Sequence, residues 1–169
     1  MSYAEVGLVR RGQWVADVHD VDGTFLRREV IDNAATTAGL NHLLATEYGG
    51  GSQVSAWYMG LVNNSGFSTF AAADTMGSHS GWSELTGYSE STRQEWVEAG
   101  ASGGIMGTTT VATFTANATI AVKGAFLTSD STKGGTTGTL AATGAFSNVQ
   151  NLTSGQTLRL SYTVTLTSS

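Results

Sequence analysis

The amino-acid sequence predicts an all-β protein with one short helix, built as a jelly-roll or Ig-like antiparallel β-sandwich with long loops. Three observations lead to this fold class. Apolar and polar residues alternate at period two through several short segments, turn-forming clusters separate these segments, and only one segment carries a helical apolar stripe. The length of 169 residues suits one compact domain, which we expect to span residues 1–169.

The N-terminal region predicts a small meander of strands. Val6 to Val9 and Trp14 to Val18 have the alternation of strands, and Phe25 to Ile31 forms a third. The dipeptide Asp22-Gly23 lies between the second and third strands, and Asp-Gly is a common two-residue hairpin turn. These strands therefore pair with their neighbours in the sequence.

The period then changes and predicts a helix over about residues 34–47. Asn33 is a suitable cap, Leu40 to Leu44 contribute to a helical apolar stripe, and Gly49 to Gly51 end the helix. The next segment, Trp57 to Val62, is apolar at both alternating positions. A strand covered on both faces requires this pattern, so we expect it to lie in the core.

Residues 63–107 form a long excursion of Gly- and Ser-rich connections. Loops of this length are uncommon in a compact domain unless they have a function. Trp82, Tyr88 and Trp96 are spaced along the excursion, and large amphipathic rings are typical anchors of protein interfaces. We select these three as candidate protein-interface residues. The alternatives are core packing and a stacking platform for sugars.

The C-terminal region predicts half-buried strands separated by turns. Leu158 to Leu166 alternates strictly between apolar and polar residues, and Ala118 to Phe126 carries its larger apolar groups at even positions. A short strand is expected from Leu140 to Phe146, after the turn cluster Ser129 to Gly135. Short strands at regular spacing indicate a sandwich or a barrel.

Composition excludes several classes of partner. The net charge is −5 with only eight Lys and Arg residues, whereas phosphate binding needs clustered basic residues. No run approaches the roughly 18 apolar residues of a membrane helix, and the first residues lack the layout of a secretory signal. We therefore expect a protein made in a cytoplasm that binds neither nucleic acid nor membrane.

Charge is distributed unevenly along the chain. Residues 1–98 hold twelve of the thirteen acidic residues, and residues 99–169 are rich in Thr, Ser, Gly and Ala. Strands of such low charge would aggregate through their edges unless other surfaces cover them. This distribution favours a protein that is covered by partner subunits.

No pattern in the sequence predicts an active site, a metal site or a cofactor. Cysteine is absent, which excludes disulfides and thiol chemistry. Gly77 to Gly81 has His79 at the centre, where a nucleophile elbow requires Ser. The three histidines lack the spacing of common zinc sites. We expect a protein that is not an enzyme.

Two sets of acidic residues could suggest a binding or catalytic site, but each is explained more simply by ordinary structure. Asp17, Asp20 and Asp22 lack the remainder of a calcium-binding loop, and Asp22-Gly23 is already explained as a turn. Four glutamates of the excursion would allow a pair of carboxylates for glycoside hydrolysis, but a solvated loop has the same composition. These are Glu84, Glu90, Glu95 and Glu98.

An ordered series of short blocks resembles a group of tailed-bacteriophage virion structural proteins. The resemblance covers most of residues 30–168 and contains no catalytic signature. Its blocks are Asn33 to Leu44, Trp57 to Val62, Ala73 to Met76, Gly81-Trp82, Tyr88 to Glu90, Thr92-Arg93, Gly124 to Leu127 and Tyr162 to Leu166.

The resemblance implies a capsid decoration, or cement, protein. Such a protein binds the phage capsid surface and stabilises contacts between major capsid subunits through many modest contacts. Its partners would be the major capsid protein and itself, as a homodimer or homotrimer, and it would be found in the virion after synthesis in the host cytoplasm. The alternatives are a structural protein of the tail or head–tail junction and a carbohydrate-binding β-sandwich module. Residues 1–12 would form an arm that reaches a neighbouring subunit.

Overall fold

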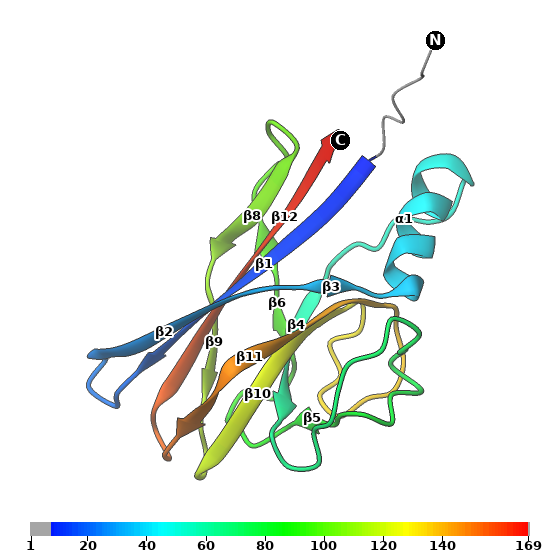
Figure 1. Cartoon of the computed structure of the whole chain (residues 1–169). Helices are drawn as coiled ribbons and strands as arrows, with labels where there is room; N and C mark the ends of the chain where they lie inside the picture. Colours follow the sequence, from blue (N-terminus) through cyan, green and yellow to red (C-terminus); the bar gives the residue numbers. More distant parts are fainter. Residues whose placement is uncertain (1–7, 169) are drawn as a thin grey trace.

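The computed structural model describes residues 8–168 and confirms a β-sandwich with one short helix (Figure 1). All strand pairs are antiparallel, in two six-stranded sheets. The β1 sheet has the order β2 (Phe25–Asp32), β1 (Leu8–His19), β12 (Thr157–Ser168), β8 (Ile105–Thr110), β7 (Val97–Glu98), with β9 (Ala112–Thr115) also on β12. The β10 sheet has the order β3 (Ala34–Ala35), β11 (Leu140–Leu152), β10 (Ile120–Thr128), β4 (Tyr58–Asn63), β5 (Glu84–Leu85), with β6 (Gln94–Glu95) also on β4.

The main core lies between the two sheets and follows the period-two pattern. On β12, Leu158, Leu160 and Tyr162 are fully buried, and they alternate with polar residues. Tyr162 lies directly opposite Trp14 of β1, and the two ring centroids are 4.3 Å apart. Burying rings of this size supplies much of the hydrophobic stabilisation of a sandwich.

The predicted N-terminal meander is confirmed in outline, although its first two strands are one. β1 runs without a break from Leu8 to His19, so the break expected after Val9 does not occur. A turn forms at the expected place but is longer than the two residues Asp22-Gly23, because the Gly23 amide donates to the Asp20 carbonyl at 2.9 Å; Gly23 has a φ of 86° that favours glycine. Residues 8–12 pair with β12, so they are not a free arm; the rest of the predicted arm lies outside the described residues.

The predicted helix over about 34–47 starts three residues later. Ala34 and Ala35 pair with β11 as strand β3, and α1 runs Thr37–Tyr48. The cap is Thr36 instead of Asn33, because the Thr36 hydroxyl accepts a hydrogen bond from the Gly39 amide at 3.0 Å. Asn33 donates to the hydroxyl of Tyr162 at 2.8 Å.

The first half of the excursion over 63–107 forms a third layer on the outer face of the β10 sheet, whereas the second half supplies β5 and β6 to that sheet and β7 and the start of β8 to the β1 sheet. Phe126 points away from the main core, on the face opposite its neighbours Ala125 and Leu127. Residues of the excursion pack against this outer face and make a second, smaller core. Its members are Val62, Met76, Trp82, Phe126 and Leu140, with Phe67 and Phe70 beside them.

The C-terminal strands form where the alternation predicts them. β10 begins at Ile120 and β12 at Thr157, close to the expected positions. β11 is longer than expected, because it continues past Phe146 to Leu152. Within the part of the chain that the structure describes, no helix is long and apolar enough to cross a membrane.

Candidate functional site

An apolar groove of about 350 Å³ opens between α1 and the end of the β1 sheet. The groove has a volume typical of sites for small apolar groups. It reaches inward to the main core, since Trp57 and Leu127 contribute to its lining. The other main apolar lining residues are Trp96, Met106, Val164 and Leu166.

The groove exists because α1 contacts the sandwich at few points. Gly39 is the only buried residue of the helix, and a side chain there would meet the backbone of Ala141 on β11, with only 2.7 Å to its Cα. The helix is therefore held near its first turn, and its later turns extend away from the sheets (Figure 1).

The outer face of α1 is apolar and exposed. Leu44 is 56% exposed and Tyr48 is 80% exposed, and Leu40 and Leu43 are exposed beside them. A helix of 12 residues is marginal in water unless tertiary packing stabilises it. Contiguous apolar surface of this kind marks sites of protein–protein contact.

Few polar groups surround the groove. The His42 and Trp57 rings are 5.5 Å apart in an edge-to-face arrangement, and Arg10 donates to the Ala141 carbonyl at 3.4 Å. Both His42 and Arg10 line the groove, together with Glu98. This chemistry suits an apolar side chain from another protein, with polar groups only at the rim.

The structure overturns the prediction that Trp82, Tyr88 and Trp96 are exposed interface anchors. Trp82 is 4% exposed, Tyr88 is 0% exposed and Trp96 is 4% exposed. They are core residues because the excursion packs on the sandwich instead of extending into solvent: Trp82 belongs to the small outer core, and Tyr88 and Trp96 belong to the main core. Trp96 alone contributes to the groove, as part of its inner wall.

Each tryptophan of this set has an internal partner for its indole N–H. Trp82 donates to Asp74 Oδ2 at 3.0 Å. Trp96 donates to Thr108 Oγ1 at 3.0 Å and to the Tyr162 carbonyl at 3.2 Å. Buried indoles satisfied in this way are structural.

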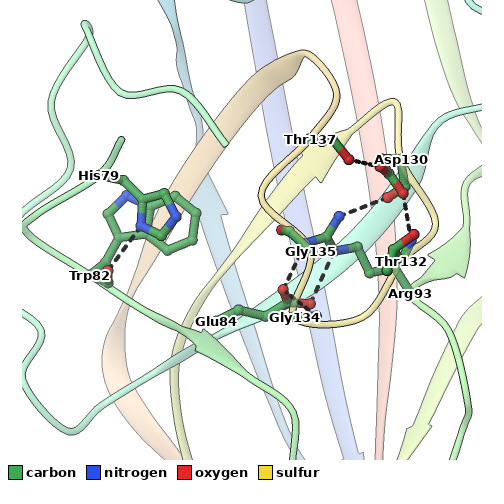
Figure 2. A network of polar contacts seen from close by, with 9 residues as sticks. All are labelled: His79, Trp82, Glu84, Arg93, Asp130, Thr132, Gly134, Gly135 and Thr137. Carbon is green, nitrogen blue, oxygen red and sulfur yellow. Dashed lines mark hydrogen bonds and ion pairs between the residues drawn. The ribbon is translucent and has the colours of Figure 1, made fainter. Parts of the chain in front are cut away.

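His79, the central residue of the segment that was compared with a nucleophile elbow, also has a structural role. Figure 2 shows its ring stacked on Trp82, with ring centroids 3.9 Å apart. Its Nδ1 lies 3.0 Å from the Trp82 carbonyl oxygen. The histidine therefore covers the small outer core and fixes the local turn.

Tyr88 lies under a lysine. The Lys133 ammonium is 4.5 Å above the centroid of the Tyr88 ring, and Phe114 meets the same ring edge-on at 5.0 Å. Burial raises the pKa of the Tyr88 hydroxyl, and the nearby Glu84 carboxylate raises it further. The phenol is neutral at any ordinary pH.

Arg93 is the centre of a buried polar network that the sequence did not reveal (Figure 2). Its guanidinium binds both carboxylate oxygens of Glu84, at 3.0 and 2.7 Å. It also donates to the carbonyls of Asp130, at 2.9 Å, and Gly135, at 2.7 Å. The network joins the excursion to the loop between β10 and β11.

The same loop contains a second fixed carboxylate. The Thr137 hydroxyl and the Thr132 amide donate to Asp130, and these hydrogen bonds lower the pKa of its carboxyl to about 2. Asp130 therefore remains ionised and holds the turn Thr132 to Gly135 in place.

The glutamates considered for glycoside hydrolysis do not form a free pair. Glu84 is bound to Arg93, and Glu90 accepts hydrogen bonds from the Thr115 amide at 3.0 and 3.2 Å. Glu95 and Glu98 are exposed on short strands. Among residues 8–168, no group of three or more His, Asp or Glu side chains is placed to hold a metal ion.

A scan of the sequence against protein-family models finds no match, and a search of curated proteins finds no similar chain. The resemblance to phage virion proteins thus depends on the sequence blocks alone. The groove and the apolar face of α1 are the surface on which a function can be argued from the structure.

Proposed function

We propose that this protein is a structural component of a tailed-bacteriophage particle that binds the capsid surface as a decoration protein. It would be made in the host cytoplasm and would stabilise contacts between major capsid subunits. The observation that carries the proposal is the exposed apolar face of α1, Leu40, Leu43, Leu44 and Tyr48, beside an open groove. The resemblance of the sequence blocks supplies the kind of particle.

The major capsid protein is the proposed occupant of the groove. An apolar side chain of the capsid subunit would enter between Leu43 and Val164, where the lining is apolar. The exposed leucines of α1 would be covered at the same time. Burying each such side chain contributes about 1.5–3 kcal/mol, so a few of them suffice when many copies bind one shell.

A position in the tail or at the head–tail junction is the second candidate, because the same apolar surface would serve there. The number of copies in each particle distinguishes the two positions. A carbohydrate-binding module is not proposed, because the rings that would stack on sugars, Trp82, Tyr88 and Trp96, are buried.

Binding to particles that lack this protein tests the proposal. Leu44→Ser and Tyr48→Ser together remove exposed apolar groups from α1 without touching the core. We expect at least tenfold weaker binding, which corresponds to about 1.4 kcal/mol. Val21→Ser is the matched control, because Val21 is 70% exposed in the turn after β1, away from the helix.

Quantitative mass spectrometry of purified particles gives the copy number. A large fixed ratio to the major capsid protein supports decoration of the shell, and a few copies per particle indicate the tail. Absence from particles, or equal binding by the α1 variant and the Val21 control, would contradict the proposal.

A further inference from the structure

The N-terminal end of β1 has a free edge, because β2 does not accompany it (Figure 1). Pairing between β1 and β2 extends from His19 only to Gln13, and the Asn33 amide adds one hydrogen bond to the Gly12 carbonyl at 2.8 Å. The chain then leaves the β1 sheet and pairs with β11 as β3. Residues 8–11 therefore pair with β12 alone within the described part of the chain.

The backbone groups of Leu8 and Arg10 point toward this free edge. Arg10 lies opposite Leu166 of β12, and the Leu166 amide donates to the Gly104 carbonyl at 2.8 Å, on the side away from β1. In an antiparallel pair, the backbone groups of two opposite residues point either toward each other or both away, and the direction alternates along each strand. Leu8 and Arg10 therefore offer two N–H donors and two C=O acceptors that no other described residue uses.

Arg10 is a cation in an apolar place. Its side chain lines the groove beside α1, and its only side-chain hydrogen bond within residues 8–168, to the Ala141 carbonyl, is long at 3.4 Å. The two ion pairs of the described chain belong to other arginines, Arg28 and Arg93. Covering a guanidinium without a carboxylate is costly, so a partner that covers the groove needs an acidic group at this point.

We propose that an extended segment of the major capsid protein adds to β1 as a strand along this free edge, with a carboxylate opposite Arg10. Strand addition uses the free backbone groups for affinity and alternate side chains for specificity. The groove of about 350 Å³ receives side chains, and the backbone of the added strand lies along β1 at its mouth. The identity of the partner rests on the proposed function, whereas the strand position and the required charge rest on β1.

The register sets the side chains that the added segment must carry. Directly opposite residues share one face of a sheet, so an Asp or Glu opposite Arg10 points with it toward the groove. The residue opposite Leu8, two positions away, points to the same face, and an apolar residue there covers Leu8, which is 69% exposed. Asn33 already occupies the position beside Gly12, so the added strand ends before it. The segment thus carries an apolar and an acidic residue two positions apart, with the acidic one nearer Asn33.

Reversing the charge at Arg10 tests the acidic partner. Arg10→Glu places a carboxylate against the proposed one, so binding to particles that lack this protein should weaken by about tenfold or more. Arg11→Glu is the matched control, because it makes the same change of charge on the opposite, exposed face of β1 and should bind within about twofold of the wild type. Arg10→Lys keeps the charge and should retain more binding than Arg10→Glu.

Proline at position 8 tests the backbone contact. Leu8→Pro removes the N–H that faces the free edge, and strands tolerate Pro at such positions. This variant should bind particles about three- to tenfold more weakly than Leu8→Ala, which loses the same exposed side chain but keeps the N–H. Hydrogen exchange at the amides of Leu8 and Arg10 should slow by about tenfold or more when the chain is bound to particles.

The outcomes separate this inference from the proposed function. Weaker binding by Arg10→Glu than by Arg11→Glu, together with slower exchange at Leu8 and Arg10, supports strand addition. Equal binding by the two charge variants, or unchanged exchange at Leu8 and Arg10 in the bound chain, would overturn strand addition and leave the capsid role in place. A wild-type chain that does not bind particles would overturn both.

Discussion

Replacing Arg93 with Met tests how much the buried network that joins the excursion to the β10–β11 loop stabilises the fold. The Arg93 side chain is 0% exposed and that of its partner Glu84 is 9% exposed. The substitution keeps an unbranched apolar stem but removes the guanidinium and its four hydrogen bonds. Glu84 keeps only the amide of Gly134, at 2.9 Å, and two carbonyls lose their donors.

The expected loss of unfolding free energy is about 3–5 kcal/mol, as for other buried ion pairs that lose one partner. For a chain of this size, each kcal/mol lowers Tm by roughly 2–4 °C. Urea and thermal unfolding followed by tryptophan fluorescence measure both quantities. The double variant Glu84→Gln with Arg93→Met should recover part of the loss, since no buried charge then lacks a partner.

Arg28→Met is the matched control, because Arg28 also pairs with an acid but its side chain is 58% exposed. An exposed ion pair contributes about 0–1 kcal/mol, so this variant should unfold almost as the wild type does. An Arg93→Met loss no larger than that of Arg28→Met would refute the role assigned to the network.

Three further substitutions test separate parts of the structure. Tyr88→Phe should leave the unfolding free energy unchanged within about 1 kcal/mol, because the buried hydroxyl has no hydrogen-bond partner within residues 8–168; a larger loss in chemical denaturation would contradict this. Gly39→Val should weaken the contact of α1 with Ala141 and lower stability by about 1–3 kcal/mol, and unchanged hydrogen exchange in α1 would argue against that contact. Thr137→Val should raise the pKa of the Asp130 carboxyl from about 2 toward its ordinary value, as measured by NMR titration. Because the folded-state pKa is the lower one, its stabilisation is present above the ordinary value and is lost as pH falls toward 2, so the variant should be less stable than the wild type at neutral pH and should lose less stability on acidification.

The strands were predictable from the sequence because their signal is local. In β12, each apolar residue lies two positions from the next, and burial of one face is enough to produce that pattern. The start of α1 was not predictable in this way. Ala34 and Ala35 suit a helix by propensity, but they pair with Ala142 and Thr143, which are far away in the sequence.

The error over Trp82, Tyr88 and Trp96 has the same cause. A Gly- and Ser-rich composition is typical of an exposed loop. Only contacts with residues far away in the sequence show that this segment is packed. Arg93 binds carbonyls 37 and 42 residues further along the chain, and no spacing in the sequence marks those partners. The sequence did not predict that the apolar face of α1 is exposed, because its leucines have the spacing of a helix that buries this face.

The uneven charge of the chain is accounted for in part by the way its C-terminal strands pair. Among the weakly charged C-terminal strands, β12 pairs with β1 on one side and with β8 and β9 on the other, and β10 lies between β11 and β4. Central strands need no charge to prevent edge pairing. Open edges remain at β2, whose eight residues include two Arg, one Glu and one Asp, and at β11, which has no strand partner on the β3 side beyond Thr143 within residues 8–168. The apolar face of α1, on which the proposed function depends, lies in the more highly charged N-terminal half of the chain.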